Sequence, residues 1–355
     1  MINTLLLTEH DLAQWSRRYR RGEVPAPMPY GVDALGSLGF GLRGLGRSTH
    51  PLAVKARDMV DHRLGYPVEG ALRGIPATAR AGLVLALLER QGMAAAVLKR
   101  RRIPPYRRTP LVIWSCWLAD DLRTASPETR RALVRRVAAA DLITHLSRHE
   151  SDIFAGVGIH PDRLFPVTYG VSHRFYTPDP TVARDIGILA VGQDRGRDYQ
   201  TLVDAVRGTD LTLDIVTRPD NLAGIDLPPN VRAHGTVSLP EYRRLLRRAQ
   251  VVAIPTRDLA YPTGSSVALE AASSGCAVAV TGTRAMRDYF SDDVDAVLVG
   301  EGDVEGWRTV LRELGDDPDR RARLGSAARL NVEHTHNADH MWRELAEVLR
   351  ARGVV

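Results

Sequence analysis

A glycine and two serines directly before an apolar helical pattern form the part of this sequence best suited to bind an anion. Residues 264–266 read Gly-Ser-Ser, and the residues that follow predict a helix over 267–274. The first N–H groups of a helix have no partner inside the helix, and the helix dipole adds partial positive charge at the same end. We therefore expect a phosphate or diphosphate group to bind at this helix N-terminus.

Glu270 lies about one turn into the same predicted helix, among apolar residues. Burying an unpaired carboxylate is costly, so a glutamate on an apolar helix face needs a partner. In dinucleotide-binding folds an acidic residue accepts hydrogen bonds from ribose hydroxyls, and Glu270 is a candidate for that role. The alternatives are a surface glutamate or a glutamate paired with an arginine.

A second segment suited to phosphate follows a predicted strand over 186–191. It begins with Gly192 and Gln193 and contains Arg195 and Arg197. A planar guanidinium group forms paired hydrogen bonds with phosphate oxygens, so these arginines could neutralise a diphosphate without a metal ion. Solvent-exposed surface arginines are the alternative interpretation.

Strand and helix patterns alternate along the chain, which is typical of α/β proteins with parallel sheets. The alternation restarts at residue 186, after a proline-containing stretch over 177–184. At 355 residues the chain is about twice the usual domain length. We predict two Rossmann-like domains facing across a cleft, over 1–178 and 179–335, and a final helix over 336–355 that could cross back to the first domain. Within the first predicted domain, the apolar pattern of residues 77–99 predicts one or two helices.

Candidate residues for a second ligand lie in the first predicted domain. Gly39 and Gly41 belong to a glycine-rich stretch that could let backbone approach a ligand or simply form turns. Trp114 and Trp117 lie at the end of a predicted strand, where they could line a pocket or belong to the core.

Composition indicates a folded protein of the cytosol, with 44% hydrophobic and 25% charged residues. No apolar run reaches the roughly 18 residues that a membrane span needs, and the first residues lack the order of a signal peptide. Cys116 and Cys276 both lie in apolar surroundings, which favours two buried small side chains over a disulfide or metal site.

Positive charge is concentrated in residues 1–180, which carry 26 Lys and Arg against 16 Asp and Glu. Residues 99–108 are the most basic stretch and could contact an anionic membrane surface or a phosphorylated acceptor. The alternative is a set of solvated arginines. Nucleic acid is not an expected partner, because no recognition helix, zinc finger or stacking platform accompanies the charge.

The segment over 261–280 resembles the donor-binding motif of the retaining GT-B glycosyltransferases of family 4, also called glycosyl transferases group 1. In that motif two glutamates are separated by seven residues and precede a Gly-x-Pro/Ala-Val-Val turn. The resemblance implies that Glu270 binds the nucleotide ribose and that the amides of residues 264–267 surround the diphosphate. Pro262 takes the place of the first glutamate, which in the family lies beside the donor sugar.

Other segments are similar to the same family. Residues 191–199 match the stretch in which an Arg and a Lys bind the donor phosphates, with Gln193 at the Arg position and Arg197 at the Lys position. Residues 169–178 resemble the crossing between the domains. The resemblance covers residues 127–355, whereas residues 1–126 match in architecture alone and lack the family's histidine at the end of strand 112–117.

The resemblance implies transfer of a sugar from a UDP- or GDP-linked donor to an unidentified acceptor, with retention and without a metal or other cofactor. Arg195 and Arg197 would then be the catalytic residues at the departing diphosphate. The implied donor-binding residues are Gly192, Gln193, Gly235, Val237, Pro262, Thr263, Gly264, Ser265, Ser266, Val267 and Glu270. The remaining alternatives are a pseudo-glycosidic coupling enzyme or phosphorylase of the same fold, and a catalytically inactive nucleotide-sugar-binding protein. The expected partners are the donor, the acceptor and, through the basic stretch, the inner face of an anionic membrane.

Overall fold

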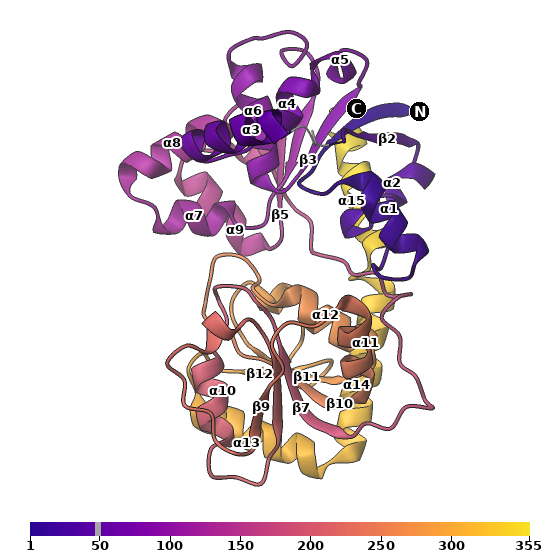
Figure 1. The fold of residues 1–355 in the computed structure, drawn as a ribbon, viewed down its shortest axis with the longest axis vertical. Coiled ribbons are helices and arrows are strands. Elements are labelled where there is room, and N and C mark those ends of the chain that lie inside the picture. The colour runs from indigo at the N-terminus through magenta and orange to yellow at the C-terminus, as the bar shows by residue number, and fades with distance from the viewer. Residues whose placement is uncertain (47–50) are drawn as a thin grey trace. The chain divides into compact units, whose positions relative to one another are not determined.

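The computed structural model describes residues 1–46 and 51–355 (Figure 1). The chain divides into two compact units. The first unit comprises Met1–Arg20, Pro27–Val167 and Trp342–Val355, and the second comprises Arg21–Ala26 and Thr168–Met341. The sequence-based boundaries were drawn after residues 178 and 335. The second unit already begins at Thr168, and its last residue, Met341, lies within the final helix, α15 (Ala338–Ala351).

A six-stranded parallel sheet forms the centre of the first unit, in the order β2-β1-β3-β4-β5-β6. Its strands are β1 (Ile2–Leu7), β2 (Phe40–Gly44), β3 (Leu83–Leu87), β4 (Leu111–Trp114), β5 (Leu142–His145) and β6 (Leu164–Pro166). The helices of this unit, besides α15, are α1 (Leu12–Arg20), α2 (Ala34–Ser37), α3 (Pro51–Leu64), α4 (Glu69–Arg73), α5 (Ile75–Thr78), α6 (Glu89–Arg100), α7 (Leu118–Thr124), α8 (Pro127–Val137) and α9 (Arg148–Gly156).

The strand β3 corrects the prediction of helices alone over 77–99. Its five residues, Leu-Val-Leu-Ala-Leu, are all fully buried, and helix α6 begins only at Glu89. A central parallel strand is covered on both faces, so its sequence is apolar throughout and lacks the alternation of a half-exposed strand. Periodicity alone cannot distinguish such a run from a buried helix.

The second unit has another six-stranded parallel sheet, in the order β12-β11-β10-β7-β8-β9. Its strands are β7 (Ile186–Val191), β8 (Leu213–Val216), β9 (Val231–Ala233), β10 (Ala249–Ile254), β11 (Ala277–Thr281) and β12 (Val297–Val299). Its helices are α10 (Tyr199–Val206), α11 (Leu239–Arg248), α12 (Ser265–Ser273), α13 (Val304–Asp316) and α14 (Pro318–His334). The predicted α/β class with two Rossmann-like sheets is confirmed.

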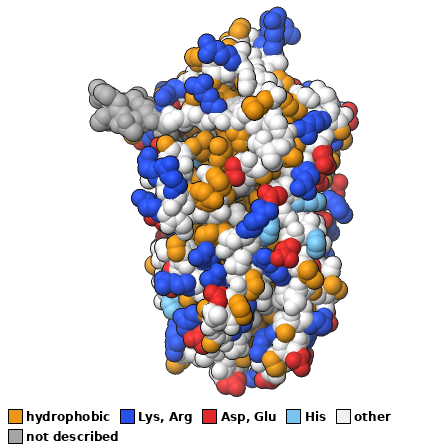
Figure 2. Space-filling model, turned by 90° about the vertical axis from the view of Figure 1, so that its right-hand side faces the viewer, with side chains coloured by type: hydrophobic (Ala, Val, Ile, Leu, Met, Phe, Trp, Pro, Cys, Tyr) orange, Lys and Arg blue, Asp and Glu red, His pale blue; other side chains and the backbone are white. Residues whose placement is uncertain are grey.

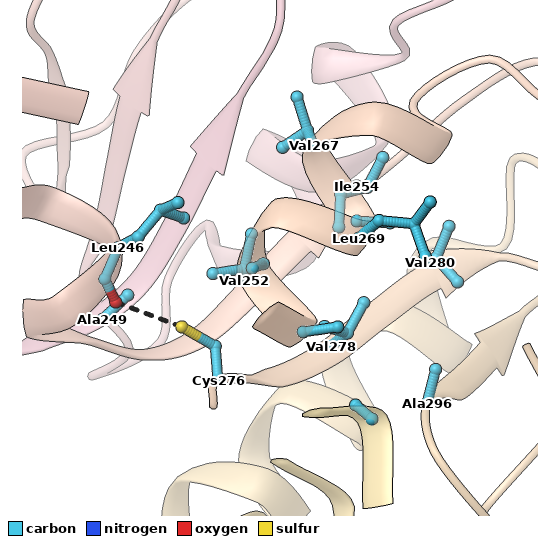
Figure 3. Packing of buried hydrophobic residues seen from close by; sticks show 14 of the residues in the cluster. Leu246, Ala249, Val252, Ile254, Val267, Leu269, Cys276, Val278, Val280 and Ala296 are labelled. Atoms are coloured by element: carbon cyan, nitrogen blue, oxygen red, sulfur yellow. Dashed lines mark hydrogen bonds between the residues drawn. The ribbon is translucent and has the colours of Figure 1, made fainter. Parts of the chain in front are cut away.

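Two hydrophobic clusters cover the two faces of the second sheet. Alternate residues of β10 belong to different clusters, Val252 and Ile254 to one and Val251 and Ala253 to the other, as strand geometry requires. Figure 3 shows the first cluster, in which the Cys276 thiol donates a hydrogen bond of 3.1 Å to the Leu246 carbonyl. Cys276 is therefore a buried core residue, as expected, whereas Cys116 is half-buried; both thiols are free.

Candidate functional site

The predicted phosphate-binding segments meet at the carboxyl edge of the second sheet. Strand β7 leads into residues 192–198, and its neighbour β10 leads through residues 255–264 into α12. Between β7 and β10 the strand order changes direction, because β8 and β9 lie on one side and β11 and β12 on the other. Ligands of open α/β sheets bind in the crevice at such a switch point.

Arg197 lies between these two loops with its guanidinium group against two glycines. A Cβ atom added to Gly192 would lie 2.1 Å from the Arg197 Nε atom, and one added to Gly264 would lie 2.5 Å from Nη1. Both glycines have positive φ angles, of 149° and 86°. The structure thus brings Gly192, Arg197 and Gly264 together, and glycine is required at both positions by space as well as by backbone conformation.

The Arg197 guanidinium group is buried but incompletely hydrogen-bonded. The residue is only 9% exposed. Within the described part of the chain, its Nε and Nη1 atoms are buried and have no hydrogen-bond partner. A buried cation without partners is unfavourable, so this site is built for an anion that supplies acceptor oxygens.

The N-terminus of α12 borders the same point. Gly264 is the N-cap residue and adopts the left-handed conformation, so no side chain caps the first N–H groups of the helix. Pro262, Thr263 and Ser265 are buried, while Ser266 is half-buried. The Ser265 N–H donates to the Pro262 carbonyl at 3.0 Å, so the amides that follow it in the first turn of α12 and the Arg197 guanidinium group can bind one diphosphate from two sides.

Asp194 joins the two loops, a role that the sequence did not indicate. Its Oδ2 atom accepts hydrogen bonds from the Tyr261 hydroxyl at 2.7 Å and from the Thr263 hydroxyl at 2.8 Å. Its Oδ1 atom accepts from the backbone N–H of Arg195 at 2.8 Å. No spacing rule pairs residue 194 with 261 and 263, because the contact exists only once β7 and β10 are neighbours.

The two arginines of the first loop lie in different environments. Arg195 is exposed, whereas Arg197 is buried at the glycines. Gln193 is also exposed, and its carbonyl accepts a hydrogen bond of 3.0 Å from the Arg218 guanidinium group. The Gly192 carbonyl accepts from the hydroxyls of Tyr199 and Thr217, so the peptide that follows it is held in one orientation.

Glu270 is bound by tyrosines rather than by an arginine. The Tyr242 hydroxyl donates a hydrogen bond of 2.8 Å to Oε2 of Glu270, and the Tyr176 hydroxyl also hydrogen-bonds to this carboxyl. Burial raises the pKa of Glu270 to about 7, and the two tyrosines and the charge of Arg197 partly offset that rise. The carboxyl is therefore half-ionised near neutral pH, on the helix whose first turn borders the anion site.

Gly235 and Val237 lie beyond the carboxyl end of β9, on the edge strand of the sheet. Gly235 has a φ angle of 67°, and Val237 packs against the hydrophobic cluster that contains α11 and α12. Beside them, the His234 Nε2 atom lies 2.5 Å from Oδ1 of Asp214. These residues lie at the same carboxyl edge of the sheet, beyond β8 from the neighbouring strands β7 and β10.

The four candidate residues of the first unit are not brought together. Gly39 and Gly41 lie at the amino end of β2, whereas Trp114 ends β4 at the carboxyl edge of the same parallel sheet. Trp114 is 2% exposed and packs against Tyr30 and Trp342, with ring centroids 5.0 and 5.8 Å away. It is a core residue, and Gly39 and Gly41 cannot share a site with it.

Beside β4, Trp117 is half-buried, and its backbone N–H donates to the buried carboxylate of Glu89 at 3.4 Å. The Cys116 N–H donates to the same oxygen at 3.0 Å, and the Ser115 hydroxyl does so at 3.3 Å. Glu89 therefore orders the loop that follows β4, and Trp117 is the one candidate of the first unit that stays at the carboxyl edge without being fully buried.

The basic stretch over residues 99–108 lies at the opposite, amino edge of the first sheet. Helix α6 begins after β3 at the carboxyl edge and runs back, so the residues between α6 and β4 follow its far end. Lys99 pairs with Asp141 at 3.0 Å, and Tyr106 is buried with its hydroxyl bonded to the Ala71 carbonyl. This placement argues against contact of the stretch with an acceptor bound at the carboxyl edge. The face drawn in Figure 2 mixes Lys and Arg with acidic and hydrophobic side chains.

Neither a metal cluster nor a membrane span is found in the described ranges. No three His, Cys, Asp or Glu side chains within residues 1–46 and 51–355 are grouped as metal ligands. No helix in those ranges combines the length and apolarity needed to cross a bilayer. Reaction without a metal and contact with a membrane surface stay predictions.

Comparison with known proteins agrees with the geometry of the second unit. Residues 195–347 match the sequence model of a family described as glycosyl transferase-like. The D-inositol 3-phosphate glycosyltransferase of Xylanimonas cellulosilytica is 38% identical over 224 residues, which cover 54% of this chain and 53% of the relative. The D-inositol 3-phosphate glycosyltransferase of Gordonia bronchialis is 24% identical over 258 residues, which cover 61% of this chain and 55% of the relative. These matches agree with the resemblance to the group 1 glycosyltransferases described above. The chain spans about half the length of the curated relatives it matches.

Solved structures show that the chain has the GT-B fold. Sucrose-phosphate synthase from Thermosynechococcus elongatus superposes with a TM-score of 0.72 at 15% identity, and 98% of each chain is covered. The Anabaena protein HepE in complex with UDP-glucose gives a TM-score of 0.70 at 14% identity, covering 99% of this chain and 100% of HepE. At such low identity the likeness establishes the fold alone.

Pro262 is where the chain departs from the donor-binding motif described above. The structure places a carboxylate close to that position by another route. Asp194 accepts hydrogen bonds from the side chains of Tyr261 and Thr263, the residues on either side of Pro262. An acidic group is thus present next to residue 262 although residue 262 is not acidic.

Proposed function

We propose that this protein transfers a glycosyl group from a nucleoside-diphosphate sugar to an acceptor hydroxyl. The observation that carries the proposal is the buried Arg197 guanidinium group, whose Nε and Nη1 atoms lack partners in the described structure. It lies against Gly192 and Gly264, at the uncapped N-terminus of α12. A diphosphate supplies both the negative charge and the acceptor oxygens that this arrangement lacks.

The transfer needs stabilisation of charge on the leaving group. The bond between the anomeric carbon and the distal phosphate oxygen breaks, and a bond forms to the acceptor oxygen, whose proton is released. Positive charge develops on the sugar ring while negative charge grows on the diphosphate. Arg197 and the first amides of α12 are fixed before the reaction, so they stabilise that negative charge without reorganising. We propose that no metal ion is required.

The nucleotide would lie along the carboxyl edge of the second sheet. With its diphosphate at Arg197, a ribose reaches Glu270 on α12, whose carboxylate can accept from two hydroxyls. The nucleobase would then lie towards Gly235 and Val237. A uridine nucleotide is the first donor to test, because HepE, which shares the fold, was solved with UDP-glucose. We extend the proposal to retention of the anomeric configuration, as the family resemblance implies.

Two measurements on the full chain test this function. Calorimetric titration with UDP and GDP reports binding, and incubation with UDP- and GDP-sugars plus an acceptor panel, followed by mass spectrometry, reports transfer. We expect saturable binding of one nucleoside diphosphate and a product heavier than the acceptor by one glycosyl residue. Nucleotide binding without any product would favour a nucleotide-sugar-binding protein. Absence of nucleotide binding would contradict the proposal.

A further inference from the structure

The first unit contains a polar pocket at the carboxyl edge of its sheet, outside the donor site. Thr8 after β1 and Leu45 and Gly46 after β2 form part of its wall. Residues of α3 and α4, Pro67 between these helices and Gln91 in the first turn of α6 form the rest of the described wall. The carboxyl ends of parallel strands are where small-molecule sites of open α/β sheets occur. We call it the first-unit pocket.

Charged groups of both signs line the wall of the pocket. Among the described lining residues two are arginines, Arg57 and Arg73, and three are carboxylates, Asp58, Asp61 and Glu69. The Glu69 carboxylate bridges the arginines, since Oε2 lies 3.4 Å from Arg57 Nη1 and Oε1 lies 2.9 Å from Arg73 Nη1. Arg57 also pairs with Asp58 at 2.7 Å. Both guanidinium groups are therefore already neutralised by acidic side chains of the same wall.

This pairing selects against an anionic ligand. A phosphate group offers only acceptors and carries about two negative charges, so it would have to displace Glu69 and lie beside two further carboxylates. The concentration of positive charge in residues 1–180 does not extend to the described wall of the pocket, where carboxylates outnumber arginines.

An uncharged ring with several hydroxyl groups fits the same wall. Each hydroxyl can donate to one carboxylate and accept from one guanidinium group, so it satisfies neighbouring groups of opposite sign without breaking their pairing. The Gln91 amide and the Thr8 hydroxyl add one uncharged donor and acceptor pair each. The side chains of Glu69 and Arg57 are only 16% and 21% exposed, so these polar groups are held in place before a ligand binds.

We propose that the first-unit pocket binds an uncharged polyhydroxylated ring, a sugar or cyclitol without a phosphate group, as the acceptor. Calling this ring the acceptor rests on the proposed glycosyl transfer. The proposal that the pocket binds such a ring does not depend on that transfer. The curated relatives are named for inositol 3-phosphate, so this chain would differ from them in the charge of its acceptor.

The test pairs neutral and phosphorylated probes. Saturation-transfer NMR on the full chain would use glucose, mannose, galactose and myo-inositol, each against its monophosphate. We expect at least one neutral probe to bind at least tenfold more tightly than its monophosphate. Tighter binding of the monophosphates, or no binding of any neutral probe, would overturn the proposal.

Variants then locate the binding. Glu69→Gln removes the shared carboxylate and releases both arginines, so the neutral probe should bind about tenfold or more weakly and its monophosphate more tightly. Gln91→Leu should weaken binding of the neutral probe without tightening binding of its monophosphate. Glu305→Gln, in an exposed pair with Arg308 on α13, is the matched control and should change neither. Unchanged neutral binding in both pocket variants would also overturn the proposal.

UDP titration of each variant keeps this test separate from the proposed function. Unchanged UDP affinity shows that the nucleotide site of the second unit is intact in Glu69→Gln and Gln91→Leu, and an unchanged melting temperature shows that the first unit of each variant is folded. If wild type binds the neutral probe but not UDP, the transferase proposal fails and the pocket assignment stands.

Discussion

The Tyr242 hydroxyl donates a hydrogen bond of 2.8 Å to the carboxyl group of Glu270. Both side chains belong to the second unit, one on α11 and the other on α12, and the burial that surrounds them raises the pKa of Glu270 to about 7. A carboxyl group in this position changes between acceptor-only and donor forms near neutral pH. Its ability to accept two ribose hydroxyls therefore depends on Tyr242 and on pH.

Tyr242→Phe should weaken UDP binding about three- to tenfold at pH 7. The substitution removes one donor to the ionised carboxylate, which raises the pKa of Glu270 further and lowers the fraction able to accept from ribose. Calorimetry at pH 7 and pH 9 separates this effect from damage to the fold. Affinity should recover at pH 9 if Glu270 titrates, and a loss of equal size at both pH values would contradict the mechanism.

UDP affinity of the wild type should rise with pH between about 6 and 8 and then level off, because ionised Glu270 is the form that accepts from ribose. Glu270→Gln should bind UDP more weakly and lose the part of the pH dependence that belongs to Glu270. The measurement is a calorimetric titration series across this range. A pH profile identical in wild type and variant would mean that another group titrates.

The raised pKa of Glu270 affects the stability of the fold in the direction opposite to its effect on UDP binding. The pKa of Glu270 is raised above its unfolded value of 4.5, so the folded state binds more protons between pH 4.5 and about 7. Its contribution to stability therefore falls as pH rises through that window. We expect the melting temperature of Glu270→Gln, relative to wild type, to increase from pH 5 to pH 8. A constant difference across this range would contradict the burial of an ionisable Glu270.

Arg197→Gln should reduce turnover by roughly 10²- to 10³-fold, because it removes a fixed charge at the departing diphosphate. Arg195→Gln is the matched variant two residues away, and its exposed position predicts a much smaller effect. The readout is steady-state release of the nucleoside diphosphate, with melting temperature as the check on folding. Equal losses in the two variants would mean that the loop acts as a whole.

Asp194→Ala should lower the affinity for UDP about tenfold while leaving most of the stability in place. The variant removes the acceptor that joins the loop after β7 to Tyr261 and Thr263, so Arg197 and the start of α12 are no longer held together. Tyr261→Phe and Thr263→Val each remove one of these bonds and should give intermediate losses. The idea fails if all three variants bind UDP like wild type.

Charge reversal of Arg101, Arg102, Arg107 and Arg108 to Glu should leave the Michaelis constant of the acceptor unchanged. These residues lie between α6 and β4, at the amino edge of the first sheet. Co-sedimentation with anionic and neutral vesicles at low and high salt tests the remaining role of the basic stretch. A raised Michaelis constant for the acceptor would contradict the assignment of the acceptor to the carboxyl edge.

The sequence by itself determined the features that depend on neighbouring residues. The Gly-Ser-Ser loop before α12 and the restart of strand and helix alternation at residue 186 are local, because they follow from side-chain size and short-range periodicity. The strand β3 was assigned wrongly, since burial on both faces removes the alternation that marks a strand.

Tertiary structure decided which of the candidate residues share a site. The sequence could not separate Arg197 from Arg195, because burial of one depends on Gly192 and Gly264 meeting across β7 and β10. The sequence could not predict that tyrosines hydrogen-bond to Glu270 or that Tyr261 hydrogen-bonds to Asp194. These contacts join residues that are far apart in the chain. Gly39 and Trp114 lie at opposite edges of one sheet because all six strands are parallel, and strand direction is set by pairing partners that no single segment contains.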